Sequence, residues 1–141
     1  MWQKFILKYP EYQNKTYQAW NYGAEPDELA RLTFEEIKTA TASAYEDYAL
    51  EKEDLPQEGE LSIVLDADDE AVCIIKITKV LVVPFLEVSE EHAFKEGEGD
   101  RSLRYWREVH KVFFEASYKE SGLTFHDNIP VVCEEFEVIY K

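Results

Sequence analysis

The segment from Ile37 to Ser43 combines one lysine with three hydroxyl groups. Lys38 is followed by Thr39, Thr41 and Ser43, and only alanines separate the hydroxylated residues. Small side chains let a ligand approach the backbone closely, and hydroxyl and N–H groups bind phosphates or base edges. The alternative is a strand edge with solvated hydroxyls and a surface lysine. The segment is a candidate ligand site that needs a second element to complete it.

The second candidate runs from Glu96 to Ser102, where two glycines alternate with Glu96, Glu98 and Asp100 and precede Arg101. A long helix is predicted to follow, and the free N–H groups at a helix start favour anions. Arg101 can hold a phosphate or carboxylate with two hydrogen bonds. The alternatives are a solvated loop in which Asp100 or Ser102 caps the helix, or a divalent cation on the acids. The acids lack EF-hand spacing, so we expect neither a metal nor a cofactor.

Aromatic and histidine side chains flank this loop. Tyr105 and Trp106 offer faces on which a nucleobase can stack, although the helical position of Trp106 favours core packing instead. His92 and His110 share no spacing typical of metal ligands, so we expect them at a helix surface or core edge.

The charge of the chain restricts its ligands. Its 141 residues hold 30 acids against 15 bases, a net charge of −15. Such a chain repels a polyphosphate at long range and is a poor general binder of nucleic acids. Residues 92–111 carry five bases against four acids and are nearly neutral. We therefore expect an anionic ligand, where there is one, to be short and to bind there.

The elements that position these residues predict an α+β fold. The expected elements are a helical segment over residues 1–20 packed on the domain, a helix from Pro26, a short strand or loop over 39–44, a hairpin of strands 61–65 and 71–83, a helix capped by Ser89, a helix over 102–120 and a strand over 131–140. The length suits one domain over residues 1–141. Apolar runs are too short to span a membrane and no signal peptide is recognised, so we expect a cytoplasmic protein.

Several of these motifs together resemble the ASCH domain family, in its longer bacterial type. The resemblance covers residues 20–139 and rests on the Lys38-Thr39-x-Thr41 element, the hairpin with its Pro84-Phe85 end, the stretch EGEGDRSLxYW from Glu96, and the closing strand from Val131. It implies a PUA-like fold, which is a small β-barrel with flanking helices.

The resemblance also implies functions. The family is linked to RNA binding, RNA modification and translation, and one bacterial branch consists of amidohydrolases that deacetylate N4-acetylcytidine. That branch uses a lysine and a threonine in a KTxT element and a glutamate in a His-Ala-x-x-Glu stretch, which correspond to Lys38, Thr41 and Glu96. Its arginine after KTxT is absent, since Ala42 and Ser43 stand here.

Three functions remain open at this stage. The first is an amidohydrolase of N4-acetylcytidine-like nucleosides, with Lys38 as base, Thr41 as nucleophile and Glu96 as orienting group or acid. The second is a non-catalytic module that binds a nucleotide or short RNA, and the third is a partner-regulated protein without turnover. For the first two, the expected ligand contacts are Thr39, Ser43, Glu98, Asp100, Arg101, Ser102 and Tyr105. The oligomeric state is not predicted.

Overall fold

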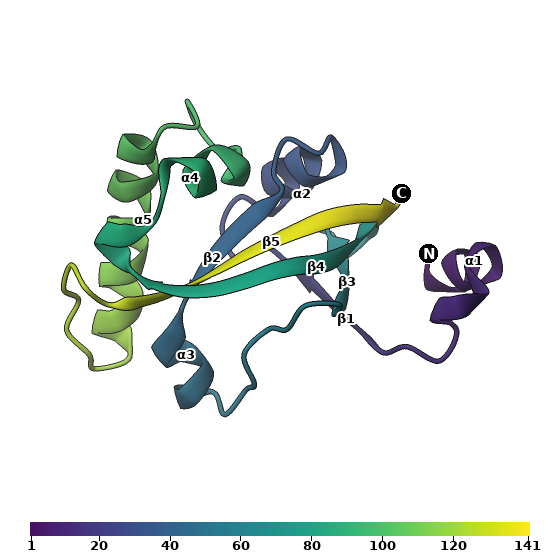
Figure 1. The fold of residues 1–141 in the computed structure, drawn as a ribbon, viewed down its shortest axis with the longest axis horizontal. Coiled ribbons are helices and arrows are strands. Elements are labelled where there is room, and N and C mark those ends of the chain that lie inside the picture. Colours follow the sequence, from purple (N-terminus) through teal and green to yellow (C-terminus); the bar gives the residue numbers. More distant parts are fainter.

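A computed structural model describes residues 1–141 and contains one sheet with helices around it (Figure 1). The strands are β1 (Tyr17–Asn21), β2 (Ala40–Ala44), β3 (Leu61–Leu65), β4 (Ala71–Pro84) and β5 (Pro130–Tyr140). The helices are α1 (Trp2–Lys8), α2 (Pro26–Phe34), α3 (Tyr45–Leu50), α4 (Glu90–Glu96) and α5 (Leu103–Glu120), with short 3-10 turns η1 (Pro10–Tyr12) and η2 (Phe85–Glu87). The sheet has the order β1-β3-β4-β5-β2 and curls into a half-barrel. This confirms the predicted α+β, PUA-like fold class.

The two long strands β4 and β5 form the spine of the sheet. β4 is rich in valine and isoleucine, which favour an extended backbone. It pairs antiparallel with β5 from Ile74 opposite Tyr140 to Pro84 opposite Pro130. Two register shifts between these ends bend the strands locally. β3 pairs antiparallel with the start of β4, which confirms the predicted hairpin.

The two edges of the sheet are built differently. β2 pairs antiparallel with β5, with Thr41 opposite Glu134 and Ala42 opposite Cys133. β1 pairs parallel with β3, with Tyr17 opposite Leu61. The expected helical segment over residues 1–20 is therefore only partly helical. It is an α-helix over Trp2–Lys8, and its last residues extend because they join the edge of the sheet.

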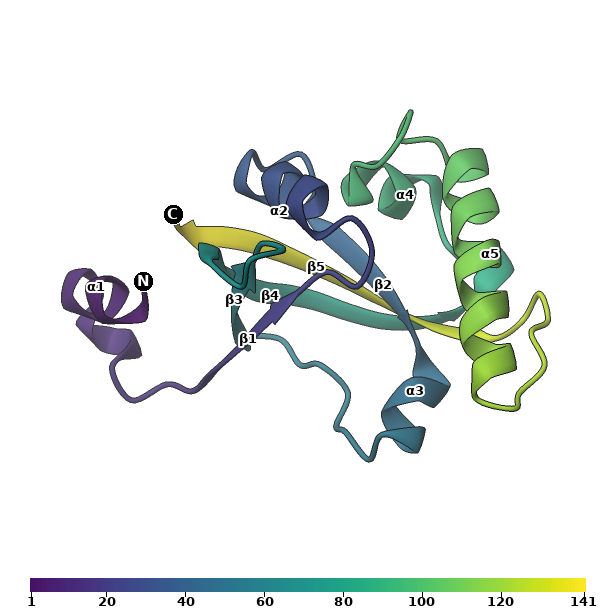
Figure 2. The ribbon, with the colours of Figure 1, turned by 180° about the vertical axis from the view of Figure 1, so that it is seen from behind.

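The helices bury three groups of apolar side chains against the sheet. Figures 1 and 2 show α4 and α5 together at one end of β4 and β5, and α1 at the opposite end. The cluster under α4 and α5 includes Trp106, Phe114 and Val131, so the expected core position of Trp106 is confirmed. α2 packs over a second cluster that includes Tyr22, and α1 inserts Phe5 into a third. None of the helices combines the length and apolar character needed to cross a membrane.

Several expected helix ends are confirmed at the level of single hydrogen bonds. Pro26 begins α2. The side chain of Ser89 accepts a hydrogen bond from the backbone N–H of His92, and that of Ser102 accepts one from Tyr105. The short helix α3, which follows β2 directly, was not predicted from the sequence.

Candidate functional site

The turn after α2 directs Lys38 into the interior. Glu36 takes a positive φ of 61°, and the backbone N–H groups of Ile37 and Lys38 both donate to the carbonyl oxygen of Leu32. This tight end of the helix leaves the Lys38 side chain only 1% exposed. A lysine is almost never buried to this degree without partners for its charge.

The Lys38 ammonium has three partners. Its Nζ donates to the backbone oxygen of Ala40 at 2.8 Å, to Oε2 of Glu98 at 3.0 Å and to Oε1 of Glu96 at 3.4 Å. Three acceptors match the three N–H donors of a lysine ammonium. The resemblance implied that Lys38 and Glu96 belong to one site, and the structure brings them together across 58 residues of chain.

Glu96 ends α4 and is 2% exposed. Its Oε2 faces the indole Nε1 of Trp106 at 2.5 Å and Nε2 of His92 at 2.7 Å, and its Oε1 lies 3.5 Å from Nε2 of His110. Burial by itself raises the pKa of Glu96, but the charge of Lys38 and the hydrogen bonds from His110 and His92 outweigh burial and lower it well below its usual value. Glu96 is therefore an ionised carboxylate with partners on both oxygens. We call Glu96, Lys38 and the side chains that contact either of them the Glu96 network: Lys38, His92, Glu96, Glu98, Trp106 and His110.

Two glycines allow the loop after α4 to close over this network. Gly97 has a φ of 73°, and a Cβ there would lie 2.6 Å from the backbone oxygen of Ile37. Gly99 has a φ of 60°, and a Cβ there would clash with the ring of Tyr105. Only glycine suits both the backbone conformation and the close approach. The loop can therefore reach Lys38 and place Glu98, whose side chain is 23% exposed, at its solvent side.

The other predicted ligand contacts in this loop bind the protein itself. The guanidinium of Arg101 lies 3.6 Å from the centre of the Phe94 ring, and its Nε donates to the backbone oxygen of Phe94 at 3.0 Å. Asp100 accepts a hydrogen bond from the backbone of Ser102, which in turn caps α5. The ring of Tyr105 packs beneath Gly99. These contacts hold the loop in shape, and ligand binding by the four residues stays a prediction.

The three hydroxyl groups of the segment from Ile37 to Ser43 have different neighbours. Thr39 links the start of β2 to α4. Its backbone N–H donates to the backbone oxygen of Lys95 at 2.7 Å, and its hydroxyl lies 3.4 Å from the same oxygen. The Ser43 hydroxyl is 2.7 Å from the hydroxyl of Tyr48. Thr41 is half-buried and lies opposite Glu134, and no hydrogen bond joins it to Lys38 or Glu96.

Three residues near Lys38 and Glu96 were not predicted as part of the site: His92, His110 and Glu134. His92 and His110 were expected at a surface or core edge, yet both face Glu96. His92 and Glu96 are four residues apart, as are Trp106 and His110, so each pair lies on one face of its helix. This spacing could have indicated that the histidines contact Glu96. Nothing in the sequence around Glu134 indicated that it lies near Lys38.

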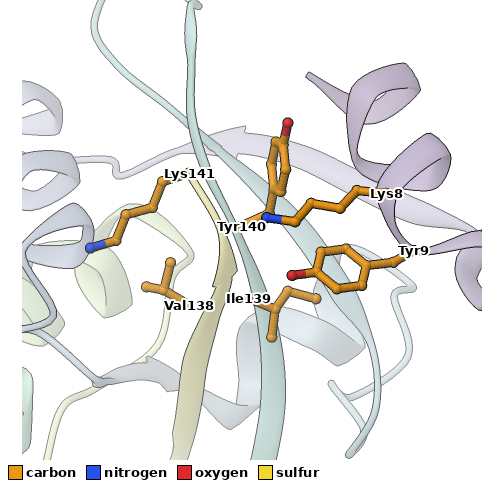
Figure 3. A pocket seen from close by; sticks show the side chains of 6 residues that line it. All are labelled: Lys8, Tyr9, Val138, Ile139, Tyr140 and Lys141. Atoms are coloured by element: carbon orange, nitrogen blue, oxygen red, sulfur yellow. The ribbon is translucent and has the colours of Figure 1, made fainter.

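Two of the surface hollows are lined by residues other than the predicted catalytic residues. One, of about 350 Å³, lies between the end of α1 and the end of β5, as the side chains in Figure 3 show. The other, of about 140 Å³, is lined by His92, Cys133 and Glu135 among others, and it adjoins the Glu96 network through His92.

Comparison with known proteins places the chain in a family. The ASCH domain model matches residues 18–140. A crystal structure of an ASCH domain from Lactobacillus crispatus is 32% identical, with a TM-score of 0.90 over 99% of this chain and 94% of that one. A protein from Enterococcus faecalis assigned to the DUF984 family is 33% identical, with a TM-score of 0.86 over 99% of this chain and 85% of that one. No protein of curated function matches. The chain belongs to the ASCH domain family.

Proposed function

We propose that this ASCH domain is an amidohydrolase that deacylates a small, uncharged nucleoside of the N4-acetylcytidine type, through Lys38, Thr41 and Glu96. The observation that supports this proposal most is the buried ion pair between Lys38 and Glu96. Removing two charges from water is unfavourable, and well-packed apolar residues commonly stabilise a core as well or better. Charges held in this way are typical of sites where a reaction needs them.

In this proposal Lys38 acts as a fixed positive charge. The sequence suggested a base, but a lysine whose three N–H groups all face acceptors has no free lone pair to take a proton. Its charge can instead stabilise the oxyanion that forms on the acyl carbonyl. Glu98 is the one partner with appreciable exposure, so a substrate carbonyl would replace its carboxylate beside Nζ. Glu96 keeps Lys38 in place.

The charge around the site favours an uncharged substrate. Glu96, Glu98 and the nearby Glu134 surround a single lysine, in a chain of net charge −15. A nucleoside carries no phosphate, so this field does not repel it.

The alternative function is a module that binds RNA without turnover. It would use the bases of α5, but acids of the same helix lie beside two of them and partly cancel their attraction for a polyphosphate. Arg104 pairs with Glu108 at 3.3 Å, Arg107 donates to the backbone oxygen of Leu86 at 2.9 Å, and Lys111 lies 4.0 Å from Glu115. The nucleoside hydrolase is therefore the better supported of the two.

A turnover assay tests the proposal. The purified protein is incubated with N4-acetylcytidine, longer N4-acyl cytidines and N4-acetylcytidine monophosphate, and products are separated by chromatography. We expect turnover of the nucleosides, little dependence on salt, and loss of activity in Lys38→Ala and Thr41→Val. The control Lys79→Ala removes a lysine whose side chain is 54% exposed and should stay active. No turnover of any substrate would contradict the proposal, and RNA binding that weakens steeply with salt would support the alternative.

A further inference from the structure

Thr41 and Glu134 face each other across two neighbouring strands. Thr41 on β2 and Glu134 on β5 are direct partners in the antiparallel register. Side chains of such partners project from the same face of a sheet, with Cβ atoms about 4.5–5.5 Å apart. The neighbouring Glu135 projects from the opposite face, where it binds Lys95.

Neither side chain has a partner within the protein. Thr41 and Glu134 are both half-buried, yet neither forms a side-chain hydrogen bond or an ion pair. The fully buried side-chain polar atoms that lack a hydrogen bond include only Nε of Arg107, so the oxygens of Thr41 and Glu134 are accessible to solvent. Most polar side chains in such positions are satisfied, as Ser43 is by Tyr48. Two open oxygens in one place suit a ligand that bonds to both.

The surroundings of Glu134 keep its proton exchangeable near neutral pH. Burial raises the pKa of Glu134 to about 7, the charge of Glu60 before β3 adds to this, and the charge of Lys38 opposes it. Tyr48 on α3 also lies close enough for the charge of Glu134 to affect its pKa. A carboxyl group that titrates near the working pH can both take and return a proton.

We infer that Glu134 is the general base and acid for Thr41 in the deacylation, an inference that rests on the proposed function. Glu134 takes the hydroxyl proton as Oγ1 of Thr41 forms a bond to the acyl carbon, and the carbonyl oxygen becomes an oxyanion. When the carbonyl re-forms, the C–N bond breaks and the proton passes from Glu134 to the leaving N4 amine. The products at this point are the free nucleoside and an acyl ester of Thr41.

The same pair completes the reaction with water. A water molecule attacks the ester carbon, and Glu134 takes its proton. As the bond to Oγ1 breaks, Glu134 returns that proton to Thr41, and the carboxylic acid leaves. No oxidant, reductant or further reactant is needed, and both residues end in their starting states.

The experiment compares Glu134→Gln with Glu135→Gln, its neighbour on the other face of β5. We expect Glu134→Gln to lower kcat/KM by about 100- to 10,000-fold, the usual contribution of a general base, and Glu135→Gln to change it by less than about twofold. In the wild type kcat/KM should rise with pH through about 7, because the base must be ionised, and this rise should disappear in Glu134→Gln. Glu134→Asp should recover part of the activity. Thermal unfolding of each variant checks that it is folded.

The outcomes separate the two proposals. An active wild type with a nearly unchanged Glu134→Gln, or a Glu134→Gln that keeps the pH dependence, would overturn the role of Glu134 and leave the proposed function in place. A folded wild type that turns over none of the substrates would overturn both.

Discussion

Glu96 and Glu134 are two shielded carboxylates near Lys38, and their surroundings differ. Glu96 has Lys38, two histidines and an indole as partners, and its pKa is lowered in spite of burial. Glu134 has no direct partner, and burial raises its pKa to about 7. The difference shows that the partners that accompany burial decide whether a carboxylate is held ionised or stays ready to exchange a proton.

The largest expected effect comes from removing the positive charge that the two carboxylates share. Lys38→Met leaves Glu96 buried without its main counter-charge, so we expect a loss of about 3–5 kcal/mol in the free energy of unfolding, measured by urea denaturation. Lys95→Met is the matched control, since Lys95 is 32% exposed and binds Glu91 and Glu135 near the surface. The control should lose less than about 1 kcal/mol. Equal losses in both variants would contradict the special role of the Glu96 network.

The second largest expected effect is a loss of stability when the glycine loop after α4, which places Glu98 beside Lys38, is altered. Gly97→Ala forces a Cβ against the backbone oxygen of Ile37 at a positive φ, and we expect a loss of about 2–3 kcal/mol. Gly122→Ala has a similar φ of 74° with free space around it, so it should lose only about 1 kcal/mol. Thermal unfolding of both variants measures the difference, and a Gly97→Ala as stable as Gly122→Ala would mean that the close approach carries no strain.

Glu134→Gln should have an effect on stability that depends on pH. Because the pKa of Glu134 is raised in the folded state, its protonated form favours folding below about pH 4.5, and that contribution is lost as pH rises through about 7. Glu134→Gln should therefore raise the free energy of unfolding by about 3 kcal/mol at pH 8 and by less than about 1 kcal/mol at pH 5. Urea denaturation at both pH values measures this. For Glu96 the sign is opposite, since its stabilisation is present above about pH 4.5 and lost as pH falls. A Glu134→Gln variant that is destabilised equally at both pH values would contradict the raised pKa of Glu134, and with it the difference between Glu134 and Glu96.

The smallest expected effect comes from Arg101, and it tests whether this side chain stabilises the loop after α4 or binds the ligand. Arg101→Met loses the hydrogen bond to Phe94 and the contact with its ring, and we expect a loss of about 1 kcal/mol by thermal unfolding. The KM for an uncharged nucleoside should not change. A KM that rises for the nucleoside monophosphate alone would show that Arg101 binds phosphate as the sequence suggested.

Much of the fold was predictable because it depends on local patterns. The hairpin of β3 and β4 follows from two β-branched runs around an acidic turn, and α5 follows from apolar residues at helical spacing with Ser102 as its cap. β1 was not predicted, because its aromatic residues suit a helix as well as a strand, and its pairing with β3 links distant parts of the chain. α3 is a single short helix without a clear apolar stripe.

The sequence by itself determined the residue types of the site, the caps that place them and the two glycines that let the loop turn. Tertiary structure alone decided that Lys38 meets Glu96, that His92, Trp106 and His110 converge on the same carboxylate, and that Glu134 faces Thr41 without a partner. The reason is physical. Helices, turns and caps arise from interactions over a few residues, whereas the charge state of a carboxylate depends on its burial and on groups that packing brings from distant segments.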